Sequence, residues 1–302
     1  MQINDNAEDE QLKPSSSSIP SSSSWKRISS IPEESELSSL KIASFPFSDR
    51  QICHVCKRSS LAYCPYCRIP HEKYPPPQVV LPIKLDIVKH PKERVKKSTA
   101  IHAKIISPDQ TNIWDFPDIP TFDPSVTLCL FPSADAKSLD ELDLTKYDRA
   151  VFIDCTWNQT GTICQDPRIT ALQKVKIKDH RTLFWRYQHE GPEFLATIEA
   201  IYYFFKEFWM TTHKGEYNGE LDNLLYYYAF QYEQIQSVYV EDKEKRLSRH
   251  FSEQYIRARR SQEQMKSSLH KTDETKHETK EVGTEKMEPS DCIKDNHNPN
   301  TK

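Results

Sequence analysis

The sequence predicts an α/β fold with a mostly parallel sheet, a helical C-terminal part and a small N-terminal metal knuckle. Three observations support this. Short apolar runs that suit buried strands alternate with helix-like segments between residues 79 and 187. Two long aromatic-rich segments at helical spacing follow them. Four cysteines in two C-x2-C pairs precede the first strand.

Composition divides the chain of 302 residues into five segments. Runs such as SSSSIPSSSS contain few large apolar side chains, so the N-terminal segment is predicted to be a disordered tail. The end of the chain is polar and lacks periodicity, so it is predicted to be a second tail. The segments are the serine-rich tail at 1–48, the cysteine knuckle at 49–78, the main domain at 79–240, a charged helix at 241–265 and the second tail at 266–302.

The elements of the main domain follow from local sequence. VVLPIKLDIVKH predicts a first strand at 79–88, and Ser98 or Thr99 caps a short helix through STAIHAKIIS. SVTLCLFP, which ends at Pro132, and RAVFID are short apolar runs that predict buried strands. Pro167 begins a predicted helix through ITALQKV, and TLFWRY is predicted as another strand.

Two aromatic-rich segments predict the C-terminal helices. Pro192 stands where a first-turn proline belongs, ahead of EFLATIEAIYYFFKEFW. The second helix, ELDNLLYYYAFQYEQIQ, is capped after Gly219. We expect the tyrosines and phenylalanines of both helices to be mostly core and not a platform for stacking bases.

Composition also restricts compartment and partners. No apolar run reaches the length that a membrane-spanning helix needs, and the acidic start MQINDNAEDE differs from a targeting peptide. We therefore expect no membrane partner, reduced cysteines and location in the nucleus, with the cytoplasm as the alternative. The net charge of −3 is nearly neutral. Affinity for nucleic acid would thus have to come from local patches.

The cysteine pairs CHVC and CPYC predict a metal site. Two residues between thiolates let both sulfurs converge on one tetrahedral ion, and four thiolates suit zinc. The alternatives are reduced surface cysteines or a redox dithiol. Since the protein would fill all four positions, the ion would be structural. The predicted ligands are Cys53, Cys56, Cys64 and Cys67.

Glycine is scarce in this chain. There are five glycines, and the first is Gly161. The early strands therefore cannot be followed by a G-x-G-x-x-G fingerprint or a P-loop. A nucleotide-like cofactor would need another kind of loop.

The stretch VFIDCTWNQT places polar and aromatic residues after a predicted strand. Asp154 lies at the carboxyl end of that strand, where open α/β sheets bind ligands. Asp154 could act as a base, Thr156 could donate to a carboxylate or phosphate, and Trp157 could stack on a flat ring. The alternative is an aspartate that caps the turn beside a core tryptophan.

Several blocks in register resemble the DTW-domain family, the tRNA-uridine aminocarboxypropyltransferases. The cysteine knuckles and the tetrapeptide HPKE after the first strand match in order. LATIEA resembles the family's S-T-x-E-A motif, with Ala196 in place of the serine. The similarity covers roughly 50–240 and is closest to a eukaryotic branch of the family. The D-x-T-W signature is matched by Asp154, Cys155, Thr156 and Trp157.

The resemblance implies a transfer from S-adenosyl-L-methionine that is not methylation. The 3-amino-3-carboxypropyl group would move to N3 of a uridine in the tRNA D-loop, at about position 20, with release of methylthioadenosine. Residues 79–240 would be the catalytic domain, related to the knotted SPOUT-like fold, which holds its cofactor without a glycine fingerprint. The alternatives are the same transfer to ribosomal RNA, or a zinc-containing RNA-binding adaptor without catalysis. The intact D-x-T-W argues against that adaptor.

The resemblance also assigns roles within the site. Asp154 becomes the candidate general base, with a pKa that burial would have to raise for work near neutral pH. Glu199 is a candidate for the polar part of the pocket, and a solvated helix carboxylate is its alternative. The predicted cofactor-binding residues are Thr156, Trp157, Glu199, Phe131 and Pro132.

Two basic patches could follow tRNA phosphates, although either could be an ordinary solvated face. One patch lies after the first strand and the other after ITALQ. The predicted RNA-binding residues are Lys89, His90, Lys92, Arg94, Lys174, Lys176, Lys178, Arg181 and Arg186.

Overall fold

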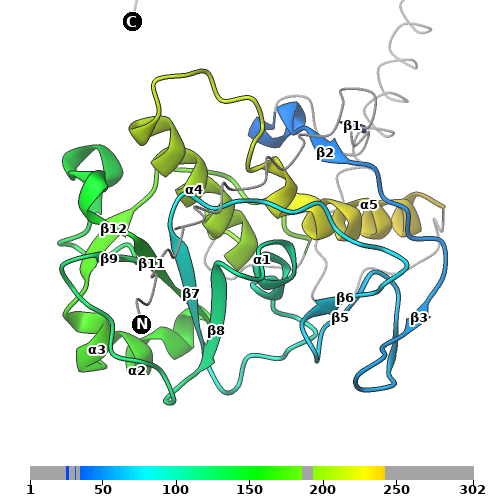
Figure 1. Ribbon diagram of the computed structural model, residues 1–302, viewed down its shortest axis with the longest axis horizontal. Coiled ribbons are helices and arrows are strands. Elements are labelled where there is room, and N and C mark those ends of the chain that lie inside the picture. Colours follow the sequence, from blue (N-terminus) through cyan, green and yellow to red (C-terminus); the bar gives the residue numbers. More distant parts are fainter. Residues whose placement is uncertain (1–24, 27–30, 32–34, 186–192, 242–302) are drawn as a thin grey trace, which may run out of the picture. The chain divides into compact units, whose positions relative to one another are not determined.

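The computed structural model describes residues 25–26, 31, 35–185 and 193–241. Six strands of this part of the chain form one sheet: β7 (Lys84–Lys89), β8 (Thr111–Asp115), β9 (Thr127–Leu130), β10 (Lys137–Ser138), β11 (Arg149–Asp154) and β12 (Gln173–Lys176). Every neighbouring pair in the order β10-β12-β9-β11-β7-β8 is parallel (Figure 1). The predicted α/β class with a mostly parallel sheet is therefore confirmed.

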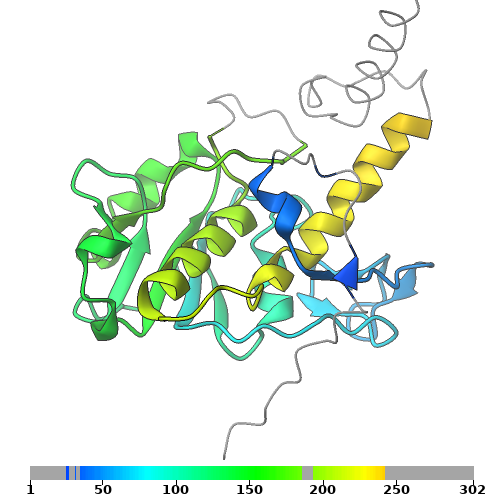
Figure 2. The same ribbon diagram turned by 90° about the horizontal axis from the view of Figure 1, so that it is seen from above.

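Helices cover both faces of this sheet. The described α-helices are α1 (Ile101–Ile106), α2 (Thr160–Cys164), α3 (Pro167–Thr170), α4 (Thr197–Thr212) and α5 (Tyr226–Glu241). Successive side chains of β11 enter different clusters, because side chains of a strand alternate between its faces. Ala150 and Phe152 pack with α1, α4 and α5, while Val151 packs with Ile163 of α2 and Ile169 of α3. Figure 2 shows α4 on one side of the strands and α2 and α3 on the other.

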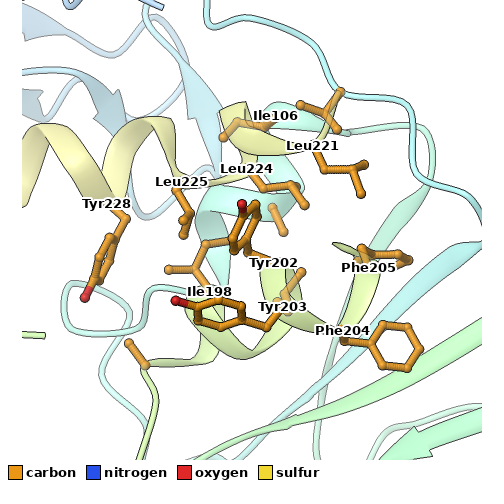
Figure 3. Packing of buried hydrophobic residues seen from close by; sticks show 14 of the residues in the cluster. Ile106, Ile198, Tyr202, Tyr203, Phe204, Phe205, Leu221, Leu224, Leu225 and Tyr228 are labelled. Carbon is orange, nitrogen blue, oxygen red and sulfur yellow. The ribbon is translucent and has the colours of Figure 1, made fainter. Parts of the chain in front are cut away.

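The larger cluster is built from aromatic residues of the C-terminal helices (Figure 3). Tyr202, Phe204 and Phe205 of α4 are each 0% exposed. The α4 helix is apolar on most faces because it lies between the sheet and the 3-10 helix η6 (Asp222–Leu225), which leads into α5. The expectation that these aromatic residues are mostly core is confirmed.

Residues 35–48 belong to this folded part, so the prediction of a disordered tail up to residue 48 is wrong for them. The 3-10 helix η2 (Glu36–Ser39) buries Leu37 at 2% exposure, and the short strand β2 (Ile42–Ala43), paired with β1 (Trp25–Lys26), buries Ile42 at 1%. The backbone N–H of Lys41 donates to Asp222 Oδ2 at 2.7 Å. A few apolar side chains among many serines were enough to anchor this segment.

Three predicted boundaries differ from the structure. The first strand begins at Lys84 and not at residue 79, because Leu81 hydrogen-bonds through its N–H to the Gln110 side chain instead of to a neighbouring strand. The helix after Pro167 ends at Thr170, and the following QKVK forms β12. The first C-terminal helix begins at Thr197, and Pro192 lies outside the described residues.

The predicted strand TLFWRY is not formed by the described residues 182–185. Leu183, Phe184 and Trp185 are buried in the aromatic cluster, so their apolar character reflects core packing without strand pairing. The predicted charged helix at 241–265, beyond Glu241, and the tail at 266–302 lie outside the described residues. None of the described helices is long and apolar enough to cross a membrane.

Candidate active site

A cavity of about 250 Å³ opens at the carboxyl ends of β9, β11 and β12. The three strands are neighbours in the sheet and run parallel, so the segments that follow them meet at one edge. The segment after β9 contributes Phe131 and Pro132, and the one after β11 contributes Cys155 and Trp157. The structure thus brings these four predicted residues together in one pocket.

Aromatic rings form one wall of the cavity. Trp157 is 40% exposed, which is unusual for a tryptophan in a folded protein. Its ring centroid lies 6.4 Å from that of Phe131 and 4.9 Å from that of Phe194, with the Phe194 ring nearly perpendicular at 86°. An exposed indole supported by two rings can stack on a flat heterocycle.

Asp154 lies directly behind this cavity. The residue is 3% exposed, and its backbone carbonyl accepts a hydrogen bond from the His90 N–H at 3.0 Å. Its Oδ2 accepts from the Ser98 hydroxyl at 2.7 Å, and its Oδ1 from the Thr197 hydroxyl at 2.8 Å. Neither hydroxyl belongs to the turn after β11, so these bonds do not make Asp154 a cap of that turn.

Burial raises the pKa of Asp154 above the ordinary value for an aspartate, and the hydrogen bonds from Ser98 and Thr197 only partly offset this effect. Thr197, at the start of α4, also lines the cavity. The Thr197 hydroxyl therefore connects the buried carboxylate to the space where a ligand would bind.

Two predicted cofactor-binding residues do not line the cavity. Thr156 is exposed and precedes the 3-10 helix η5 (Trp157–Gln159), with its N–H 3.4 Å from Gln159 Oε1. Glu199 is 0% exposed and accepts hydrogen bonds from the Thr182 and Tyr228 hydroxyls and from two backbone N–H groups.

Glu199 therefore ties α4 to α5 and to the segment before α4, and the prediction that it faces the pocket is wrong. Its alternative, a solvated helix carboxylate, is also wrong. Burial raises the pKa of Glu199, against the opposing effect of the hydrogen bonds it accepts.

Charged side chains also line the cavity. Lys176, Lys178, Asp179 and Glu193 are exposed and line it. These groups supply both signs of charge beside the aromatic rings. The lining therefore suits a ligand that carries an ammonium and a carboxylate.

His180 lies beside these charges and connects the pocket to the N-terminal segment. Its Nδ1 lies 2.6 Å from Glu36 Oε2 and its Nε2 lies 2.8 Å from Glu207 Oε1. The imidazole stacks on the Tyr203 ring at 3.6 Å. Burial lowers the pKa of His180, but the bonds to Glu207 and Glu36 outweigh burial and raise the pKa above its ordinary value.

The predicted phosphate-binding residues divide by exposure. Lys89 is 6% exposed and pairs with Asp115 at 2.7 Å. Lys174 is 8% exposed, and its ammonium donates to the carbonyls of Ile169 in α3 and of Leu172 just after that helix. For these two lysines the prediction of phosphate contact is wrong, because each ammonium is buried and already binds an acceptor within the protein.

The other predicted RNA-binding residues are half-buried, exposed or outside the described part of the chain. His90 is half-buried, and its Nδ1 accepts from the Lys92 N–H at 3.1 Å. Arg186 lies outside the described residues. The exposed members are Lys92, Arg94, Lys176, Lys178 and Arg181.

The four predicted zinc ligands converge in a separate module. Their sulfur atoms all lie within 4.8 Å of one another. Each C-x2-C pair belongs to a small hairpin, the first with strands β3 (Gln51–Ile52) and β4 (Ser59–Ser60), the second with β5 (Tyr63–Cys64) and β6 (Ile69–Pro70). Lys57 and Arg68 follow the pairs with φ of 60° and 57°, and each N–H donates to the carbonyl of the first cysteine at 2.9 Å. This repeated turn aims two pairs of thiols at one point.

Sequence reasoning missed the two hydroxyls that hold Asp154. The sequence predicts Ser98 or Thr99 as a helix cap, but α1 begins at Ile101 with Ala100 at its N-cap position and no side-chain cap. The Ser98 oxygen accepts from the Ala100 N–H at 3.2 Å, ahead of the helix. Thr197 lies within the LATIEA block, which was the available signal, but the block alone does not show that its hydroxyl meets a residue 43 positions earlier.

Residues 50–236 match the family model of the DTW domain. This chain belongs to the DTW-domain family. Membership confirms the resemblance inferred from D-x-T-W and its companion blocks. In this chain, Cys155 and Trp157 of that signature line the cavity at the sheet edge. The knot implied by the resemblance stays a prediction.

Relatives of this DTW-domain chain have been named. It is 37% identical over 237 residues to tRNA-uridine aminocarboxypropyltransferase 1 of Rattus norvegicus. The aligned region covers 62% of this chain and 78% of the relative. The chain is 35% identical over 266 residues to the Homo sapiens protein of the same name, covering 70% and 87%. The solved structure of the SAM-dependent rRNA:acp-transferase Tsr3 from Vulcanisaeta distributa aligns with a TM-score of 0.36 and 17% identity, over 53% of this chain and 82% of that chain.

Proposed function

We propose that this protein transfers the 3-amino-3-carboxypropyl group of S-adenosyl-L-methionine to N3 of a uridine in the D-loop of tRNA. The names of its relatives support the reaction class. The observation that carries the proposal is the position of D-x-T-W. Trp157 lines the cavity, and the buried Asp154 accepts a hydrogen bond from the Thr197 hydroxyl, which belongs to another residue of the cavity lining. A buried base and an exposed aromatic wall at the carboxyl edge of a parallel sheet suit transfer to a heterocycle.

The cavity residues fit the donor chemically. Trp157 and Phe131 would hold its adenine, and aromatic faces also attract the positive sulfonium. Lys176 and Lys178 would pair with the carboxylate of the transferred group, and Asp179 with its ammonium. The donor supplies an electrophilic carbon next to the sulfonium. Selection of the carboxypropyl carbon over the methyl depends on which carbon these contacts place near the uridine.

The protein's main chemical task is to accept the uridine N3 proton. N3–H is a weak acid, so attack by the nitrogen requires a base. This base must contact the N3 proton directly or through one bridging group that relays it. We propose that the Thr197 oxygen accepts this proton while its own proton passes to Asp154 Oδ1, 2.8 Å away. The N3–C bond forms as the C–S bond breaks, the bonding electrons leave on sulfur, and the proton ends on Asp154. Asp154 thus acts through Thr197.

Labelled donor tests the reaction. Purified protein is incubated with unmodified tRNA and donor labelled either in the carboxypropyl chain or in the methyl group. The proposal expects label in tRNA from the first donor and none from the second. Label from the methyl group alone, or from neither donor, would refute the proposed transfer.

A set of substitutions tests the relay. Asp154→Asn should keep the fold and slow transfer by about 10²–10⁴-fold, the usual effect of losing a general base. Thr197→Val should slow transfer comparably, while Thr197→Ser should restore most of the rate because it keeps the hydroxyl. Transfer by Asp154→Asn at the wild-type rate would exclude this role.

The pH dependence gives an independent readout of the relay. The base must be ionised to accept a proton, so the rate should fall as the pH drops through the raised pKa of Asp154. The midpoint of this acid limb should lie above the ordinary aspartate value. The limb should be absent in the residual activity of Asp154→Asn.

We also propose that the cysteine module holds one structural zinc ion. Sulfur atoms of Cys56 and Cys64 only 3.4 Å apart would repel each other as thiolates without a cation between them. The four thiols leave no position for a substrate, so the ion would support folding. Elemental analysis of protein purified without chelators should give one zinc per chain. A folded module without metal would exclude the proposal.

A further inference from the structure

A second open groove of about 580 Å³ lies between the cysteine module and α5. Figure 1 shows β5 and β6 next to α5 in this region. Its wall comes from residues 58–66 of the module and from Phe230 and Gln231 of α5, and Lys96 adds a charge from the loop after β7. The described residues that line the groove include three cations and no carboxylate. The groove is therefore a local positive site on a chain whose net charge is −3.

Two of the three cations of the groove lie over one exposed aromatic ring. Tyr66, the residue before Cys67, is 41% exposed. The Arg58 guanidinium lies 3.9 Å from the centroid of its ring and the Lys96 ammonium 5.5 Å from it. Arg50 lines the same groove and donates to Ser59. An aromatic ring between cations can stack on a base while the cations bind phosphates.

The Tyr66 ring lies on the surface of the cysteine module and not in a core. Ile52 and Val55 are 64% and 60% exposed, so three large apolar side chains of this small module face solvent. Exposure of this kind marks an interaction surface. The positive lining of the groove favours a polyanion as the partner, and exposed bases would find Tyr66.

The groove is connected to the candidate active site by one short loop. His90 at the start of the loop donates its N–H to the Asp154 carbonyl, and Lys96 reaches the Tyr66 ring. Six residues of chain span at most about 22 Å. The exposed Lys92 and Arg94 lie between these points. Exposed cations therefore lie along the loop that leads from Asp154 of D-x-T-W to the cysteine module.

We infer that this groove is a tRNA-docking surface: Arg58 and Lys96 bind backbone phosphates of the substrate, and Tyr66 stacks on an exposed base. The inference rests on the proposed function and adds a surface outside its pocket. The cysteine module then has two roles: its metal site supports folding, and its residues 58–66 form a wall of the groove. Contacts outside the pocket should affect tRNA binding and leave the chemical step unchanged.

Substitutions of exposed residues test the inference in the full-length, metal-containing protein. Arg58→Ala combined with Lys96→Ala should weaken tRNA binding by about tenfold at physiological salt and lower the slope of log K against log salt by about one per lost phosphate contact. The matched control is Lys84→Ala combined with Lys146→Ala. Both lysines are exposed and lie at the amino ends of strands, because Lys84 is the first residue of β7 and Lys146 precedes β11. Their loss should change binding little.

Tyr66 is tested separately, because stacking does not depend on salt as phosphate contacts do. Tyr66→Leu should weaken tRNA binding by about fivefold or more, and Tyr66→Phe should bind as the wild type because it keeps the ring. In every groove variant, KM for tRNA should rise while kcat, affinity for the donor and zinc content stay at wild-type values.

The outcomes separate the two proposals. Wild-type transfer with groove variants that bind tRNA like the control would overturn the inference and leave the proposed function standing. The same result would follow if the exposed module docks a protein. Absence of transfer by the wild type would overturn the proposed function, and the inference with it.

Discussion

The sheet domain and the cysteine module reach a folded state by different means. In the sheet, Leu85, Ile87 and Ala150 are each 0% exposed, so burial of apolar surface stabilises the domain. In the module, Ile52 and Val55 face solvent, and short two-residue strands frame four converging thiols. A segment this small cannot bury a core of its own, so we propose that metal ligation replaces that core. The apolar side chains of the module remain available for contact with a partner.

The largest effect should follow from removing one metal ligand. Cys64→Ser should abolish zinc binding and unfold the module, because structural zinc contributes about 10–16 kcal/mol in small metal-binding domains. Amide exchange in residues 51–70 should then become fast while β11 stays protected. Cys164→Ser, on α2 away from the cluster, is the matched control and should keep the metal. Slow amide exchange in the module of Cys64→Ser would show that the module stays folded without its metal.

A core truncation should show the opposite pattern. Phe152 is 2% exposed and packs edge-to-face on Phe204 at 5.3 Å. Phe152→Ala should lower the free energy of unfolding by about 3–5 kcal/mol, measured in urea, and leave zinc content unchanged. Val55→Ala in the module should change stability by only about 0.5 kcal/mol, since that side chain is already exposed. Equal losses of unfolding free energy in Phe152→Ala and Val55→Ala would show that apolar burial stabilises the sheet domain and the module alike.

A smaller effect concerns the N-terminal segment that packs on the sheet domain. The pKa of His180 is raised by its bonds to Glu207 and Glu36, so their stabilisation is fully present below the ordinary histidine pKa. It should be lost as the pH rises through the raised pKa. Amide exchange of residues 35–48 should therefore quicken on the alkaline side. Glu36→Gln should flatten this dependence, with a change of about 1 kcal/mol or less. A pH-independent exchange rate in the wild type would exclude this coupling.

The sequence predicted the class of the fold and the pieces of the site, but not how the pieces meet. Apolar runs identified β9 and β11, and C-x2-C spacing identified the converging thiols, because these patterns are local. The sequence ITALQKV predicts a helix, but Gln173–Lys176 forms a strand. A segment this short does not distinguish the hydrophobic period of a helix from that of a strand. Lys89 and Lys174 illustrate a further limit: charge alone does not show whether a lysine faces solvent or a buried acceptor.

Long-range contacts account for the remaining differences. The bonds from Ser98 and Thr197 to Asp154 join three distant parts of the chain, and no local pattern encodes such a meeting. Leu37 and Ile42 likewise looked isolated in a serine-rich segment, yet tertiary packing buries both. Their role depends on partners such as Asp222, which lies 181 residues from Lys41.

Nucleoside mass spectrometry identifies the product that this protein forms on tRNA. Unmodified tRNA is incubated with S-adenosyl-L-methionine and either the wild-type protein or Asp154→Asn, then digested to nucleosides. We expect 3-(3-amino-3-carboxypropyl)uridine in the wild-type sample and a fall of about 10²–10⁴-fold in its initial rate of formation with the variant. A methylated uridine, no modified uridine, or equal rates with both proteins would contradict this expectation.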